Sequence, residues 1–110
     1  TSEVLEGKIR IYNVSHDNIS GSLPAFVSSH QAPNCKMVDD FCIAYVDATD
    51  GSPSSVPKMF AADFWRDNVV AFNADGSGEG TILASGFYSP TSVRQGSGQG
   101  WDNPKSLFIT

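Results

Sequence analysis

The sequence is poor in charge and in long apolar runs. Only 17% of the 110 residues are Asp, Glu, Lys or Arg, and the seven basic residues are scattered along the chain. No basic cluster could neutralise several phosphates at once, and the formal net charge is -5, so nucleic acid is not an expected partner. No apolar run approaches the roughly 18 residues of a spanning helix, and no charged-then-apolar leader is present. We therefore expect neither membrane insertion nor a signal peptide in this chain.

Cysteine is equally scarce, with two residues at Cys35 and Cys42. Paired, they would close a small loop whose cross-link stabilises by about 2.5 kcal/mol. Zinc would need two further ligands, and only His16 and His30 are available. We predict a disulfide between the two cysteines, with buried free thiols as the alternative.

Two glycosylation sequons lie near the start of the chain, at Asn13 and Asn18. Together with the predicted disulfide and the low charge content, they are typical of an exported chain. We therefore predict a secreted glycoprotein.

Apolar residues suffice for one packed core, since they make up 40% of the chain, and we treat residues 1–110 as a single β-rich domain. Residues 8–14 alternate apolar and polar side chains, which predicts a half-buried strand. The polar segment 15–34 is interpreted as loop with an edge strand around Leu23–Val27, because Pro24 cannot donate to a ladder. Residues 41–46 are apolar on both faces, which predicts a central strand covered from two sides.

The second half of the chain reads as a hairpin preceded by a short helix. Val56, Phe60 and Phe64 recur at four-residue spacing after possible caps, which favours a helix over about residues 57–66, with a strand as the alternative. Strands at 69–72 and 81–88 flank a glycine-rich tip with an Asp75-Gly76 turn, and residues 106–109 form a last strand. The fold class is mainly β: a small antiparallel sandwich or barrel with at most one short helix.

The hairpin tip carries four side chains with oxygen atoms. Asn73, Asp75, Ser77 and Glu79 alternate with small residues, as the ligands of a calcium loop do. Ala84 stands where an EF-hand loop requires a bidentate glutamate, so the pattern predicts at most a weak calcium site, and a solvated turn is the alternative. No other cofactor is expected.

The glycine-rich loop around Trp101 is the main candidate for ligand binding. Gln99, Asp102 and Asn103 surround this aromatic residue, with Tyr88 as a possible neighbour. A flat aromatic ring flanked by amide and carboxylate groups suits a sugar or a protein partner. The alternative is that Trp101 closes one end of the core, and core packing is also expected for Trp65.

The sequence contains no strong pattern of catalytic residues. His16 and His30 could each act as a general base, but neither lies in a nucleophile or metal pattern. Residues 66–73, followed by Thr81-Ile82-Leu83, resemble the strand and hairpin of small secreted guanyl-specific ribonucleases. The resemblance implies a catalytic histidine in the strand after the hairpin, where this chain has residues 82–85 without one, so we infer no membership of that family.

Three functions follow from these patterns. The first is a non-enzymatic extracellular binding protein, of the lectin, inhibitor or effector type, whose loops contact a carbohydrate or protein. The second is a small ribonuclease-like hydrolase that uses a histidine base with Arg66 or an aspartate. The third is a structural subunit of a surface assembly, with residues 41–46 near an interface. The oligomeric state does not follow from the sequence.

Overall fold

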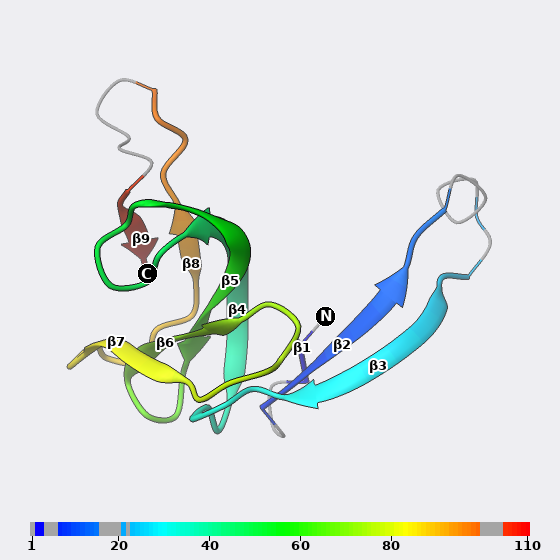
Figure 1. Cartoon of the computed structure of the whole chain (residues 1–110). Coiled ribbons are helices and arrows are strands. Elements are labelled where there is room, and N and C mark those ends of the chain that lie inside the picture. Colours follow the sequence, from blue (N-terminus) through cyan, green and yellow to red (C-terminus); the bar gives the residue numbers. More distant parts are fainter. Residues whose placement is uncertain (1, 4–6, 16–20, 22, 100–104) are drawn as a thin grey trace.

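The chain folds into three antiparallel sheets. The computed structural model describes residues 2–3, 7–15, 21, 23–99 and 105–110, and none of these residues is helical. A long hairpin, β2–β3, extends away from a body that contains the other strands (Figure 1). The first sheet has the order β1-β2-β3, the second β4-β5-β6-β7 and the third β8-β9. The strands are β1 (Ser2–Glu3), β2 (Lys8–Asn13), β3 (Ala25–Gln31), β4 (Val38–Val46), β5 (Pro53–Asp63), β6 (Asn68–Asn73), β7 (Thr81–Ser85), β8 (Val93–Gln95) and β9 (Leu107–Ile109).

Residues 59–63 of β5 and 68–72 of β6, the two middle strands, are buried on both faces, and they divide the core into two clusters. Alternate side chains of a strand point to opposite faces. On one face Met59, Ala61 and Val70 pack with Ile9 and with the segment that precedes β4. On the other face Phe60 and its neighbours pack beneath β8 and β9. The second sheet is therefore the central layer of the body.

Polar side-chain contacts connect this layer to the segments that pack on it. The Asp63 carboxylate is fully buried and accepts hydrogen bonds from the backbone N–H groups of Lys36 and Met37, each at 3.0 Å. On β4, Asp40 accepts a hydrogen bond from the Ser92 hydroxyl at 2.9 Å and forms an ion pair with Arg94. These contacts hold the turn before β4 against β5, and β8 against β4.

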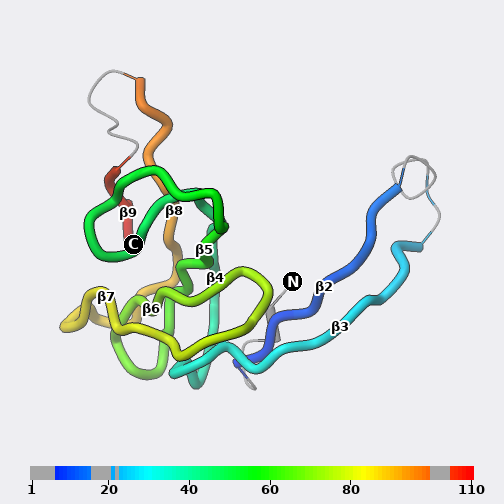
Figure 2. The backbone as a smooth tube through the Cα atoms, viewed as in Figure 1, coloured from blue at the N-terminus to red at the C-terminus, as the bar shows by residue number. Residues whose placement is uncertain are grey.

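The hairpin β2–β3 forms an arm, defined here as residues 8–31. Its tube leaves the body and extends well beyond it (Figure 2). The radius of gyration is 14.4 Å, whereas a compact domain of this length is expected near 13 Å. The arm accounts for this larger radius.

The root of the arm is fixed against the β6–β7 loop by close backbone contacts. A Cβ atom at Gly76 would lie 2.7 Å from the His30 ring, and one at Gly80 would lie 2.2 Å from the Pro33 carbonyl oxygen. Ala32 N–H also donates to the Gly7 carbonyl at 2.8 Å. Because no larger residue fits at these glycines, the arm leaves the body at a defined angle.

Most of the predicted strands are confirmed. The strand at 8–14 corresponds to β2, the edge strand to β3, the hairpin after residue 68 to β6–β7, and the final strand to β9. Pro24 directly precedes β3, so the missing N–H group falls outside the ladder, as expected for proline beside an edge strand. The predicted fold class, mainly β, is confirmed.

The helix predicted over residues 57–66 is wrong, because β5 runs through Asp63. The apolar residues from Met59 to Ala62 are buried on both sides, and this burial outweighs the four-residue spacing of Val56, Phe60 and Phe64. Pro57 is tolerated because it lies where the β4–β5 register is interrupted, between the pairs Ala44–Lys58 and Val46–Pro53.

The prediction that residues 41–46 form a central strand covered on two sides is also wrong. Strand β4 is an edge strand of the second sheet. Ala44 is buried, but Ile43 and Tyr45 on the opposite face are 51% and 63% exposed. The fully covered strands are β5 and β6, whereas β4 keeps an apolar face open to solvent.

The predicted disulfide is wrong, since Cys35 and Cys42 are both free. Cys35 belongs to one core cluster and Cys42 packs against the other, so the two thiols lie on opposite faces of the central sheet. Burial raises the pKa of Cys35 to about 12, and it also raises the pKa of Cys42. Both side chains therefore behave as apolar core groups.

Candidate functional site

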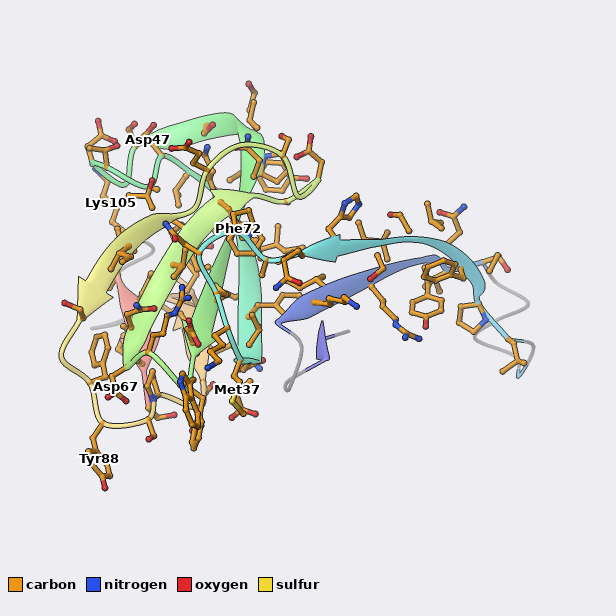
Figure 3. The ribbon with its side chains drawn as sticks, turned by 90° about the horizontal axis from the view of Figure 1, so that it is seen from below. Met37, Asp47, Asp67, Phe72, Tyr88 and Lys105 are labelled. Carbon is orange, nitrogen blue, oxygen red and sulfur yellow. The ribbon has the colours of Figure 1, made fainter. Side chains whose placement is uncertain are left out.

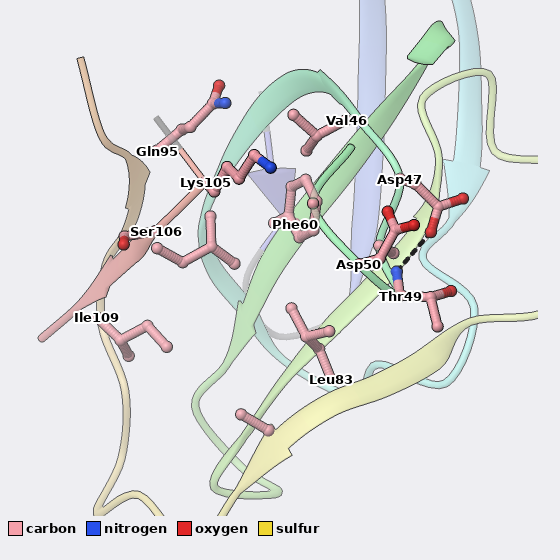
Figure 4. A pocket seen from close by; sticks show the side chains of 14 residues that line it. Val46, Asp47, Thr49, Asp50, Phe60, Leu83, Gln95, Lys105, Ser106 and Ile109 are labelled. Atoms are coloured by element: carbon pink, nitrogen blue, oxygen red, sulfur yellow. Dashed lines mark hydrogen bonds between the residues drawn. The ribbon is translucent and has the colours of Figure 1, made fainter. Parts of the chain in front are cut away.

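Several hollows lie in the described surface, and two of them have mainly apolar linings that could hold a partner or ligand. The first is a pocket of about 370 Å³ between the β4–β5 turn and strands β7 and β9 (Figure 4). Val46, Phe60 and Leu83 supply part of an apolar lining, while Asp47 and Asp50 lie at its turn side. We call it the turn pocket.

The two carboxylates of the turn pocket are engaged by their own loop. Asp47 accepts a hydrogen bond from the Thr49 N–H at 2.7 Å, and Asp50 accepts one from the Ser52 N–H at 2.8 Å. These bonds, to Thr49 and Ser52 respectively, lower the pKa of each carboxyl below its usual range. Both groups are therefore ionised at neutral pH and are unsuited to act as general acids.

The turn pocket lies beside the loop predicted to bind a ligand. Gln95 and Lys105, which flank that loop in the sequence, both line the pocket. Gln99 is exposed, whereas Trp101, Asp102 and Asn103 lie outside the described residues. The ligand assignment of these residues thus remains a prediction.

Besides Tyr45, the aromatic residues Tyr88 and Trp65 are exposed on the body. Tyr88 is 97% exposed and points into solvent on the side of the body away from the arm, well separated from Lys105 (Figure 3). The prediction that Trp65 packs in the core is wrong, because Trp65 lies in the exposed turn between β5 and β6. The ammonium group of Lys36 lies 4.6 Å from its ring centroid, which gives a surface cation–π contact.

The four predicted calcium ligands lie on the β6–β7 tip, but most of their oxygen atoms have other partners. Asn73 accepts a hydrogen bond from the Lys58 ammonium at 2.6 Å and donates one to Ser77. Asp75 caps the loop through the Ser77 N–H, and hydrogen bonds from Ser77 lower its pKa. Within the described residues, no three His, Cys, Asp or Glu side chains gather as metal ligands. Glu79, the fourth predicted calcium ligand, is exposed on the same loop.

Of the two histidines, His16 lies outside the described residues, and the structure describes His30. His30 on β3 lies 3.0 Å from the Ser28 hydroxyl, through its Nε2 atom. The cavity beside the His30 ring measures about 10 Å³, which is room for about one water molecule. Of the two sequon residues, Asn13 is exposed at the end of β2 and Asn18 is outside the described residues.

The second hollow is larger and lies between the arm and the body. It measures about 600 Å³, and its walls are the apolar face of β2 and the open face of β4. Ile11 and Tyr12 line the arm side, Phe41 and Ile43 line the β4 side, and Met59 lies between them. We call this hollow the arm groove.

A β-bulge interrupts the arm beside the groove. Ile11 pairs with Ser28 and Tyr12 pairs with Phe26, so the extra residue is Val27 on β3. Tyr12 then meets Phe26 across the hairpin, with ring centroids 5.7 Å apart in an edge-to-face contact. Val14 continues the lining of the arm groove beyond the bulge.

The arm also exposes apolar side chains that line no core. Phe26 is 58% exposed and Leu23 is 90% exposed, and Val14 and Val27 are exposed as well. Scattered exposed apolar residues are ordinary, and these four lie on the same arm that lines the arm groove.

Sequence reasoning missed the arm groove, although part of its signal was present. The aromatic and apolar residues of 23–27 lie close to the apolar residues of 9–14 in the sequence, and this arrangement is consistent with a hairpin. The long polar connection between the two segments favoured a loop instead.

Comparison with known proteins adds no further constraint: no family model, curated protein or solved structure matches this chain. Among the described residues, no helix is available to cross a membrane.

Proposed function

We propose that this domain is a non-enzymatic module that binds another protein through its arm and arm groove. The observation that carries the proposal is the arm groove of about 600 Å³, lined mainly by apolar residues, with the exposed Phe26 on the same arm. Protein partners bury apolar and aromatic side chains of this kind at the centre of an interface.

The construction of the arm supports this proposal. An isolated two-stranded hairpin is marginally stable in water, and it becomes stable when a second layer packs on it. The root of this arm packs on Gly76 and on the core, whereas Phe26 contacts Tyr12 on one side and is still 58% exposed. A protein partner would supply the missing layer. Because the predicted disulfide is wrong, the prediction that this chain is exported depends on its composition and its two sequons.

A photo-crosslinking experiment tests the proposal. Benzoyl-phenylalanine placed at Phe26 should form a covalent adduct with a protein partner, either a copy of this chain or a protein from the cells that produce it. The matched control carries the same group at Tyr88, which is also aromatic and exposed but lies away from the arm. The proposal fails if position 26 captures no protein, or captures the same proteins as position 88.

Carbohydrate binding at the turn pocket is a second candidate function. The observation that favours it is the position of Gln95 and Lys105, which line the pocket at both ends of the predicted ligand loop. The pocket volume falls within the range of about 300–1,000 Å³ found for small ligands. Titration with monosaccharides, followed by amide chemical shifts, should perturb Asp50 and Lys105. Unchanged shifts at those residues would exclude the sugars tested.

A further inference from the structure

We infer that the outer edge of strand β7 binds an extended peptide, which adds to the second sheet as a further strand and directs a basic side chain into the turn pocket. The hollows beside this edge share no lining residue with the arm groove. The inference therefore does not depend on the proposed function of the arm. It gives the turn pocket a peptide side chain in place of a sugar.

Strand β7 is an edge strand whose backbone is open on one side. Among the described strands, β6 alone pairs with it, and β7 lies at the margin of the body (Figure 1). In an antiparallel sheet, successive residues direct their N–H and C=O groups alternately toward one neighbour and away from it. About half of these groups in β7 therefore face away from β6, where an extended peptide can pair with them.

The side chains of β7 give this edge apolar surface on both faces. Ile82 is 53% exposed and Leu83 is 37% exposed. Ile82 pairs with Val70, and Ala84 pairs with Val69, so Leu83 is the extra residue of a β-bulge. Leu83 and Ala84 both line the turn pocket, and the Leu83 side chain is drawn there in Figure 4. An added strand would cover Ile82 on one face and Leu83 on the other, since its own side chains alternate between the two faces.

Strand β7 also lacks the charged side chains that commonly protect an edge strand. Its sequence is Thr-Ile-Leu-Ala-Ser, whereas exposed edges often carry lysine or proline. The bulge at Leu83 interrupts the ladder, so this edge suits a short peptide rather than an extended sheet.

The charges around β7 favour a basic peptide. Asp47, Asp50 and Lys105 line the turn pocket, and Glu79 lines a hollow of about 410 Å³ at the start of β7. The two linings together carry three acidic side chains and one basic side chain. A lysine or arginine of the added strand complements this excess. A second copy of β7 would bring the same acidic surroundings and a net charge of -5, which opposes pairing between copies.

Titration of the full chain with two synthetic peptides, followed by amide chemical shifts, tests the inference. Both are capped peptides of about eight residues that alternate valine with a charged residue, which is lysine in the probe and glutamate in its control. The lysine peptide should shift the amides of residues 81–85 and of Asp50, and the glutamate peptide should leave them unchanged. Equal responses to the two peptides, no response at residues 81–85, or shifts confined to the arm groove would overturn the inference. Shifts at residues 81–85 that follow protein concentration without peptide would overturn it too, because they would identify a second copy as the partner.

Two variants and a modified peptide separate strand addition from attraction by charge alone. Ile82→Lys should weaken binding of the lysine peptide about tenfold or more, because it places a like charge on the edge. Val56→Lys is the matched control, since Val56 is 52% exposed on β5 and lines neither hollow, and it should change the affinity by less than about twofold. N-methylation of the lysine peptide removes backbone donors at unchanged charge and should abolish binding. Equal effects of the two substitutions, or full binding by the methylated peptide, would overturn the inference. Circular dichroism of each variant shows that the fold is retained.

Discussion

The body and the arm are built from the same kind of strand but are stabilised in different ways. In the body, β5 and β6 bury side chains on both faces, and two core clusters meet at this central sheet. In the arm, the root packs on the core, and Phe26 of the aromatic pair is 58% exposed. The comparison teaches that the buried contacts which stabilise the fold are concentrated in the body, whereas the arm leaves apolar side chains exposed.

The largest expected effect comes from the centre of the body. Phe60→Ala should lower the free energy of unfolding by about 3 to 5 kcal/mol, because it opens a cavity beneath β8 and β9. Chemical denaturation measures the change. A loss below about 1 kcal/mol would show that the two-sided core is not the main source of stability.

A buried carboxylate in the body gives the next largest effect. Asp63→Ala should destabilise the domain by about 3 kcal/mol, since the backbone N–H groups of Lys36 and Met37 lose their acceptors. Asp63→Asn keeps one acceptor oxygen and should lose about 1 kcal/mol. Equal effects of the two substitutions would mean that the shape of the side chain, rather than its hydrogen bonds, holds the turn before β4.

The tether between β4 and β8 should give a smaller effect that depends on pH. Burial opposes ionisation of Asp40, but hydrogen bonds from Ser92 and Arg94 outweigh it and lower the pKa of this carboxyl. The stabilisation is therefore present above the unfolded pKa of about 3.9 and is lost as pH falls through the folded value.

Asp40→Asn should thus lower stability at neutral pH by less than about 1 kcal/mol, because the pair is partly exposed. The difference from the parent chain should shrink in acid. Denaturation at a series of pH values, with Arg94→Gln and the double variant, measures the coupling. Additive losses from the two single variants would mean that the ion pair contributes nothing.

The smallest effect on stability is expected in the arm. Phe26→Ser should change the free energy of unfolding by no more than about 0.5 kcal/mol, when measured at concentrations too low for association. Tyr88→Ser should do the same. If Phe26→Ser alone lowered the free energy of unfolding by a large amount, Phe26 would belong to the stabilising core, and the arm and the body would not differ in this respect.

The sequence predicts much of the fold because local patterns and turn residues decide several strands. Alternation identifies β2, and the Asp75-Gly76 turn identifies the β6–β7 hairpin. The helix prediction failed because a continuous apolar run has no period of its own, so the spacing of Val56, Phe60 and Phe64 could not reveal burial on both faces. For the same reason, the apolar run at 41–46 was assigned the two-sided burial that belongs to β5 and β6.

The candidate site was less predictable than the fold. The two cysteines looked like a disulfide because their separation in sequence says nothing about which face of a sheet each one occupies. The arm groove depends on Ile11 and Ile43, which come together only after the arm has folded against β4. The loop around Trp101 lies outside the described residues, so its predicted ligand role stays a prediction.

The register shift at Ile11 and Tyr12 restricts how the arm can change in length. Because side chains alternate with a period of two, deleting one residue from β2 beyond the shift would turn Val14 to the opposite side of the hairpin. Insertions or deletions in pairs would preserve the orientation of the tip. The reach of the arm can therefore be lengthened or shortened in steps of two residues per strand, about 7 Å at a time, without losing the surface it presents.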